Sequence, residues 1–305
     1  SSAAADVYKR QFMNLGEGYI EGNLLAYLGT LAATVLIWCI NRKVMTGLIY
    51  NEINKVEDTK VKTVSEYRFL ERYGEVGEYM RLELKMLLRN KRCKASLRSV
   101  AMLVIIFSII LSFSSTYDHM KSFVLVYSFL GFGMVILIQL MGFEGNYIDG
   151  LMTRKESIKS LLTAKYYIYS LAEIIPLILL IPAFVMGKAS LLGAVALIFL
   201  TTGPVYCILF QLAVYNHKTV PLNESITGKQ STNSGMQMLI SLGVFIVPTT
   251  LYGTLPMLLG QTWAYIVILI IGLGFTLTSP MWINNVYVRF MQRRYENMEG
   301  FRDSK

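Results

Sequence analysis

The sequence predicts an all-α membrane protein, a polytopic transmembrane helical bundle of about seven spans. Hydrophobic residues make up 54% of the chain and charged residues only 16%, whereas about a quarter of the residues in soluble domains are charged. Seven windows have the length of about 20 apolar residues that a helix needs to cross the hydrocarbon core. No stretch shows the alternating pattern of a membrane β-barrel strand.

The apolar windows are separated by polar or turn-forming segments and lie at approximately 22–40, 99–116, 122–143, 166–186, 190–213, 235–258 and 263–284. The last four windows contain prolines, which kink or break helices because proline has no backbone N–H group. A break between Pro248 and Pro256 would make the sixth span re-entrant. An ordinary kink is the alternative.

Basic residues are distributed unevenly between these windows. Four segments hold 25 of the 29 Lys and Arg residues: 41–98, 144–165, 214–234 and 285–305. The alternate loops hold only Lys121 and Lys188: 117–121, 187–189 and 259–262. Because basic loops stay in the cytoplasm, we expect a multi-pass protein of the bacterial cytoplasmic membrane with a cytoplasmic C-terminus. We therefore interpret the basic residues behind the net charge of +9 as signals of membrane orientation, and we expect no nucleic acid partner.

The N-terminal part of the chain differs from the rest. We expect residues 1–11 to be a spurious or unstructured leader, 12–40 to be the last span of a truncated upstream bundle, and 41–77 to be a cytosolic linker. An amphipathic helix is predicted at 78–94, where apolar residues recur at helical spacing. The basic residues of this interfacial elbow fall on an adjoining face: Arg81, Lys85, Arg89 and Arg92. A plain basic anchor before a span is the alternative.

The segment "NYIDGLMTRKESIKSLLTAKYY" at 146–167 is polar although it lies between two apolar windows. Residues 146–152 can form a short helix, and Thr153 with Glu156 matches the capping box that starts another helix. Two helices joined by a turn would give a rigid docking surface. The alternative is that residues 154–165 only extend the fourth span into the cytosol.

The order of segments over about residues 78–305 resembles the permease domain of ABC type-2 transporters. The resemblance rests on the basic helix "LELKMLLRNKR", two spans ending at Glu144, a short helix, "LMTRKESIKSLLTAKYY" and four further spans. The stretches "LERYGEVGEYMRLELKMLLRNKR" and "RFMQRRYENMEGFRD" also resemble a bacterial family of unknown function within this superfamily. Its longer members imply that this chain is a C-terminal half whose upstream permease half is missing.

The resemblance implies that the cytosolic loop 144–165 couples the permease to a separate ABC ATPase subunit. By position, the ATPase-coupling residues would be Asn146, Tyr147, Ile148, Asp149, Leu151, Met152, Arg154 and Lys155. The proline that is common before the basic turn is absent, and Met152 and Thr153 stand there instead.

Motifs of a motor or an enzyme are missing from the sequence. The strings "GKAS" at 187 and "GKQS" at 228 lack the first glycine of a phosphate-binding loop and the Ser or Thr that follows its lysine. We therefore expect no cofactor, with ATP only on the partner subunit. His119 and His217 fall on opposite predicted sides, and no catalytic motif is present, so we expect neither a metal site nor catalytic residues.

Glu173 is an acidic residue well inside a predicted span, three residues before Pro176. Because a charge in lipid is costly, Glu173 is a candidate for the translocation path or for an ion pair with an elbow arginine. Alternatively, it lies shallow enough to reach water.

The leading hypothesis is a non-enzymatic permease subunit of an ATP-driven ABC-type exporter, in contact with membrane lipid and a separate ATPase. The first alternative is a membrane-embedded enzyme that acts on lipid or glycan. The second is a membrane regulator that transports nothing.

Overall fold

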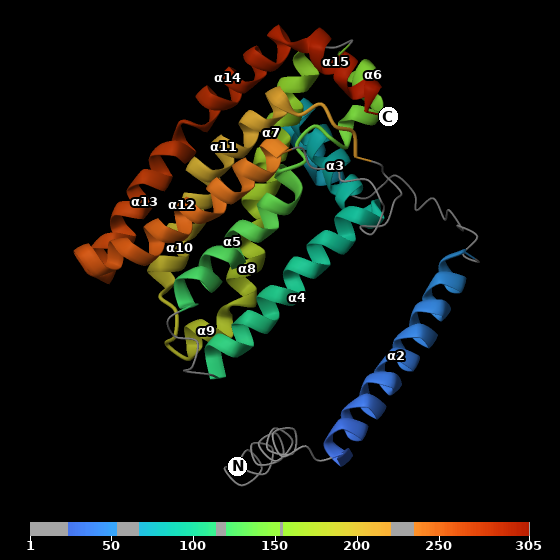
Figure 1. Ribbon diagram of the computed structural model, residues 1–305. Helices are drawn as coiled ribbons and strands as arrows, with labels where there is room; N and C mark the ends of the chain where they lie inside the picture. The colour runs from blue at the N-terminus through green and yellow to red at the C-terminus, as the bar shows by residue number, and fades with distance from the viewer. Residues whose placement is uncertain (1–23, 54–66, 114–119, 153–154, 221–234, 305) are drawn as a thin grey trace. The chain divides into compact units, whose positions relative to one another are not determined.

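The computed structural model describes residues 24–53, 67–113, 120–152, 155–220 and 235–304 (Figure 1). All regular secondary structure in these ranges is helical, which confirms the predicted all-α class. The chain divides into two compact units, residues 1–64 and 65–305.

The first unit contains helix α2, Leu24–Ile53. This helix covers the predicted apolar window at 22–40 and continues into the segment expected to be a linker. Apolar side chains such as Leu31, Ile37 and Trp38 are more than half exposed. These side chains give α2 an exposed apolar surface.

The second unit is a helical bundle. In chain order its elements are η1 (Arg68–Tyr73), α3 (Gly74–Arg89), α4 (Lys91–Phe113), α5 (Lys121–Leu137), η3 (Glu144–Tyr147), α6 (Ile148–Met152), α7 (Lys155–Ala172), α8 (Ile174–Leu179), α9 (Ile181–Val185), α10 (Leu191–Leu200), the π-helical turn η4 (Thr201–Val205), α11 (Tyr206–Tyr215), α12 (Gly235–Leu259), α13 (Gln261–Leu277), α14 (Ser279–Gln292) and α15 (Arg294–Asp303).

Four stretches of the described chain are helical, long and apolar enough to cross a membrane: Lys91–Phe113, Ile158–Leu179, Leu191–Tyr215 and Gln237–Leu259. Helices α13 and α14 meet the same criterion only when they are taken together, and they are bent by 53° relative to each other. Helix α5 is apolar but only 17 residues long. These helices are those of a membrane protein, and the total of about seven spans stays a prediction.

The prolines act differently from one helix to the next. Helix α12 runs without interruption through Pro248 and Pro256, so the structure has the continuous helix and not the re-entrant break. The sharp bend lies instead at Thr278, between α13 and α14, just before Pro280. Proline fits the first turn of a helix, where its missing N–H group has no acceptor to lose. Pro204 lies in η4, a π-helical turn that accommodates it within the long helix α10–α11.

The bundle has two ends. The loops at each end are ones that the distribution of basic residues predicts on the same side of the membrane. At the end called here the α6 end, α6 packs on α15, and the Asn146 amide donates to the Val220 carbonyl. At the opposite end, the cavity end, residues from three loops line one cavity, among them Lys121, Lys188 and Gln261. Helices α6 and α15 lie together, away from α9 (Figure 1). This arrangement is consistent with the prediction that successive helices run in alternating directions.

Candidate functional site

A buried ion cluster joins three elements near the α6 end. Lys165 of α7 places its Nζ atom 2.7 and 2.8 Å from the two carboxylate oxygens of Glu83 on α3. The same Nζ atom lies 2.8 Å from Oε1 of Glu144, the first residue of η3. The three side chains are only 1–2% exposed. The Tyr169 hydroxyl adds a hydrogen bond of 2.6 Å to Glu83 Oε1.

The amphipathic pattern of α3 explains how Glu83 comes to be buried. The buried stripe of this helix consists of Gly77, Met80, Glu83 and Leu87, so the carboxylate lies in the middle of the face that packs on α7. Two other apolar residues of α3 are less well covered, since Leu84 is half-buried and Leu88 is exposed. A buried carboxylate needs a charged partner to offset its lost hydration, and Lys165 provides one.

Two carboxyl groups share one ammonium group in this cluster. Burial, the largest effect, and the neighbouring Glu144 raise the pKa of Glu83 above its ordinary value. The Lys165 charge and the hydrogen bonds from Lys165 and Tyr169 oppose that rise without cancelling it. A single proton retained on the pair of carboxyl groups would make the cluster neutral, and the raised pKa favours its retention.

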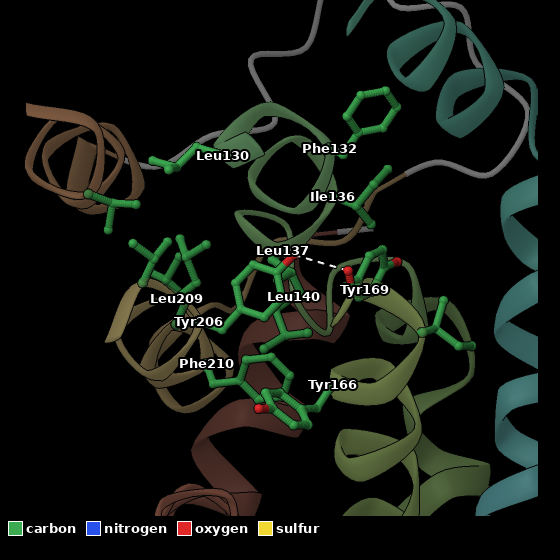
Figure 2. Close-up of a cluster of buried hydrophobic side chains, with 14 of the residues drawn as sticks. Leu130, Phe132, Ile136, Leu137, Leu140, Tyr166, Tyr169, Tyr206, Leu209 and Phe210 are labelled. Atoms are coloured by element: carbon green, nitrogen blue, oxygen red, sulfur yellow. Dashed lines mark hydrogen bonds between the residues drawn. The ribbon is translucent and has the colours of Figure 1, made fainter. Parts of the chain in front are cut away.

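Glu173 lies further along α7, at the break between α7 and α8. Its carboxylate accepts a 2.6 Å hydrogen bond from the Tyr206 hydroxyl. That hydroxyl also lies 3.2 Å from the Tyr169 carbonyl oxygen, a contact marked by the dashed line in Figure 2. The side chain is 0% exposed, and Oε2 has no hydrogen-bond partner among the described residues. The shallow, solvated placement is therefore wrong, and the partner is a tyrosine rather than an elbow arginine. A role in a translocation path stays a prediction.

The position of Tyr206 depends on a glycine of α5. A Cβ atom at Gly133 would lie 2.1 Å from the Tyr206 hydroxyl oxygen, so only glycine leaves room for the ring. Around Tyr206 lie buried apolar side chains such as Leu137, Leu140 and Phe210 (Figure 2). This apolar environment leaves Glu173 with Tyr206 as its hydrogen-bond donor among the described residues.

Lys165 and Tyr169 are four residues apart on one face of α7, and Glu173 follows four residues later, just after the helix ends. The helix thus carries a line of polar groups from the ion cluster into the apolar bundle. Neither the cluster nor its link to α3 was predicted. Two features of the sequence could have indicated the cluster. Glu144 and Lys165 are the first and last residues of loop 144–165, and Glu83 lies within an apolar face of its helix.

The segment predicted to couple to an ATPase is helical on both sides of its turn. Residues 144–147 and 148–152 form η3 and α6, and α7 starts at Lys155. Thr153 and Arg154 lie outside the described residues, as does the side chain of Lys155, so the predicted capping box is not described. A short helix precedes residues 153–154, as the docking-surface interpretation predicts, and α7 continues into the apolar stretch Ile158–Leu179, as the alternative predicts. The function of this loop stays a prediction.

The side chains of η3 and α6 divide into exposed and buried ones. Tyr147 and Asp149 are exposed, Leu151 and Met152 are half-buried, and Ile148 is fully buried. The exposed residues form a small surface at the α6 end.

The C-terminal helix holds this surface in place. Arg302 of α15 pairs with Asp149 at 2.9 Å. A Cβ atom at Gly145 would lie 2.6 Å from the ring of Phe301, so α15 packs closely on η3. The Asn146 amide donates to the carbonyl oxygens of Phe143 and Val220, each at 3.0 Å. Two of the predicted coupling residues are therefore anchored, Asn146 to Val220 and Asp149 to α15.

The predicted elbow consists of two helices instead of one over 78–94. Helix α3 ends at Arg89, and Asn90 caps α4 by accepting hydrogen bonds from the backbone N–H groups of Arg92 and Cys93. Arg81 pairs with Glu71 at 2.7 Å. Lys85 and Arg92 are half-buried and Arg89 is exposed. The four basic residues lie near the α6 end, as expected, but on two helices.

The described residues contain no group of three or more His, Cys, Asp or Glu side chains that could hold a metal ion. The ion cluster is therefore an arrangement of two carboxyl groups around an ammonium group.

Comparison with known proteins identifies a family. A family model described as "Family of unknown function (DUF5687)" matches residues 8–304. No curated protein and no solved structure matches this chain. Because the match extends over nearly the whole chain, the protein belongs to the DUF5687 family.

Proposed function

We propose that this protein is a permease subunit of an ATP-driven ABC-type exporter and that a separate ATPase acts on it through loop 144–165. The observation that carries the proposal is the buried ion cluster. It joins the segment η3–α6, the elbow helix α3 and the long helix α7 through Glu144, Glu83 and Lys165.

The ion cluster would make these three elements move together. Separating a buried ion pair leaves an uncompensated charge, at a cost of about 3–5 kcal/mol. A force applied to the exposed residues Tyr147 and Asp149 would therefore pass to α7 and α3 before the cluster came apart. Rigid transmission of this kind is what a subunit without a nucleotide site needs from its contact with an ATPase.

Helix α7 leads from the cluster to the break at Glu173, four residues beyond Tyr169. Displacement of α7 would act on the hydrogen bond between Glu173 and Tyr206, and hence on the start of α11. We propose that this route links the ATPase contact to the membrane path. Outward transport by a protein of the cytoplasmic membrane, with the α6 end in the cytoplasm, belongs to the same proposal.

Co-purification tests the proposal directly. The full chain is co-expressed with the ABC ATPase encoded nearest to its gene, and the ratio of ATPase to permease is measured after purification. Tyr147→Ala and Asp149→Ala should lower this ratio by about tenfold, since each removes an exposed side chain from the contact surface.

Glu299→Ala is the matched control, because it removes an exposed acidic side chain of α15 that lies outside the Arg302–Asp149 pair and leaves η3 and α6 unchanged. This control should retain most of the ATPase. The proposal fails if the wild-type chain retains no ATPase, or if Asp149→Ala and Tyr147→Ala both retain it at the wild-type ratio.

A further inference from the structure

Glu173 is a buried acidic side chain that has no charged partner among the described residues. It is 0% exposed, its Oε1 atom contacts the Tyr206 hydroxyl, and its Oε2 atom has no hydrogen-bond partner in the described part of the chain. It lies within the apolar stretch Ile158–Leu179. A carboxylate in such a place loses its hydration and gains no cation in return. The surroundings of Glu173 therefore favour the neutral acid.

The helices beside Glu173 present tyrosines to it rather than charges. Tyr206 of α11 faces the carboxyl group, and Tyr166 of α7 packs against the Tyr206 ring with ring centroids 6.5 Å apart. Helices α8 and α11 and the turn η4 contain no charged residue. Helix α5 contains only Lys121, at its first position.

Other helices that pack on α7 or α8 keep their charges elsewhere. The basic residues of α4 all lie within 91–98, at its start. On α3, Glu83 is directed at Lys165 and Tyr169, earlier on α7. The charged residue of α14, Arg289, forms hydrogen bonds with Gln211 and Tyr215. None of these groups supplies a counter-charge to Glu173.

The helix break at Glu173 adds another oxygen atom to the site. In a continuous helix the Glu173 N–H group would donate to the Tyr169 carbonyl oxygen, but here it donates to Ser170 at 3.3 Å. The Tyr206 hydroxyl lies 3.2 Å from the Tyr169 carbonyl oxygen (Figure 2). It also lies 2.6 Å from Glu173 Oε1. The hydroxyl therefore bridges two oxygen atoms that each need a donor.

The number of hydrogens distinguishes the ionised from the neutral form of Glu173. A tyrosine hydroxyl has one hydrogen, so it can direct it well at only one of the two oxygen atoms. With an ionised Glu173, either the carboxylate or the Tyr169 carbonyl group lacks a donor. With a proton on Oε1, the acid donates to Tyr206 and Tyr206 donates to Tyr169, so both contacts are hydrogen bonds. The oxygen positions fit the neutral form.

We propose that Glu173 is a proton-binding site inside the bundle, which holds its proton while the α7–α8 break is packed and releases it when the break opens to water. On release, the carboxyl O–H bond breaks, a water molecule takes the proton, and the electron pair stays on the carboxylate. The ligand is the proton itself. The site needs no ATPase, so this inference does not rest on the proposed function.

Gly133 shows how the break is kept closed. A Cβ atom there would overlap the Tyr206 hydroxyl and would lie 2.6 Å from the Tyr206 Cζ atom. Gly133→Ala should therefore displace Tyr206 from Glu173 and admit water to the carboxyl group. This substitution provides a way to open the site without changing either of its side chains.

Infrared spectroscopy of the purified full chain in detergent at pH 7 tests the bound proton, because neutral carboxyl groups and carboxylates absorb at different frequencies. Glu173→Gln should lack a neutral-carboxyl band that the wild type has. Glu299→Gln, which replaces an exposed acid of α15, is the matched control and should keep this band. If Glu173→Gln loses only carboxylate absorption, Glu173 is ionised and the site is refuted.

Tyr206→Phe tests the hydrogen-bond chain, since it removes the hydroxyl and keeps the ring. The neutral-carboxyl band of Glu173 should shift in frequency, because the acid has lost its acceptor. A band at the wild-type frequency would mean that Glu173 does not donate to Tyr206, and would overturn the assignment.

Exchange of the carboxyl hydrogen for deuterium tests release, because deuterium also shifts the band. Gly133→Ala should exchange about tenfold faster than the wild type, since local opening limits exchange at a buried site. Gly253→Ala is the matched control, because a Cβ atom at Gly253 makes an ordinary contact of 3.7 Å with Ser122. It should exchange at the wild-type rate.

Unfolding temperatures show whether each variant is folded. If Gly133→Ala does not fold, Tyr206→Phe takes its place in the exchange measurement and should also exchange about tenfold faster than Gly253→Ala. Equal exchange rates in the folded opening variant and in Gly253→Ala would show that loss of the Tyr206 contact does not release the proton, and would refute the proposal.

Discussion

At the scale of single residues, Lys165 is a charged side chain in a buried position, where a charge loses its hydration. Its ammonium group is almost completely buried and holds two carboxyl groups that come from other elements. A charged cluster of this kind contributes little net stability compared with an apolar replacement of all three members, whereas removal of one member leaves the others uncompensated. The effect of a substitution therefore depends on the charge that remains.

Lys165→Met should destabilise the protein by about 3–5 kcal/mol, because two carboxyl groups then face each other without a cation. Glu83→Gln should cost about 1 kcal/mol, since one ammonium and one carboxylate remain and the amide oxygen still accepts a hydrogen bond. Unfolding temperatures of the purified variants in detergent measure both effects.

Lys159→Met replaces an exposed lysine of the same helix and serves as the control. It should unfold within a degree or two of the wild type, as surface substitutions generally do. If Lys165→Met is as stable as this control, Lys165 does not hold the cluster together.

At the scale of elements, α15 and residues 216–220 form the support for α6. The Thr219 backbone N–H group and hydroxyl form hydrogen bonds of 2.9 Å with Ser304. Next to them, the ring of His217 lies edge-on to Phe301, and a Cβ atom at Gly300 would lie 2.7 Å from the His217 Cβ atom. Packing this close makes the docking of α15 sensitive to the protonation of His217.

Burial and the nearby Arg293 lower the pKa of His217, and Glu296 only partly opposes them. The unfolded chain therefore takes up a proton at a higher pH than the folded one, so this group makes the protein less stable as the pH falls below about 6.5. The stability that depends on neutral His217 is fully present above that pH.

We therefore expect the unfolding temperature to fall less in His217→Gln than in the wild type between pH 7.5 and pH 5.5. Thermal unfolding at several pH values in one detergent provides the comparison. An identical pH dependence in both proteins would show that His217 does not link α15 docking to pH.

At the scale of the whole molecule, the bundle presents two chemically different ends. The α6 end carries the packed segments η3, α6 and α15, and the cavity end carries the converging helix N-termini. The charge pattern assigns the α6 end to the cytoplasm. Exposed residues at the two ends, Glu299 in α15 and Met186 after α9, allow a test of this orientation.

In intact cells, a membrane-impermeant thiol reagent should label Met186→Cys and should label Glu299→Cys only after the membrane is opened. The parent chain, with its cysteines at 39, 93 and 207, gives the background labelling to subtract. The opposite pattern, with Glu299→Cys labelled from outside, would reverse the proposed orientation.

The sequence predicted the helical class and most helix positions, because both follow from local features. It also predicted which loops share one side of the membrane. Apolar length sets where a helix crosses lipid, and basic loops report which ends belong together. Pro280, inside the last apolar window, also signalled the bend between α13 and α14. By contrast, the end of α3 was missed because it depends on one asparagine side chain acting as a cap.

The sequence by itself determined that this is a helical membrane protein with a structured polar hairpin at 144–165. Only the tertiary structure decided that Glu83 pairs with Lys165, 82 residues away, and that Glu173 faces Tyr206. It also brought the starts of α5, α10 and α13 to one cavity. Local patterns report how polar a segment is, but the partner of a buried charge depends on how each helix is rotated against the others. That rotation is set by packing across the whole bundle, including the space left at Gly133 for Tyr206.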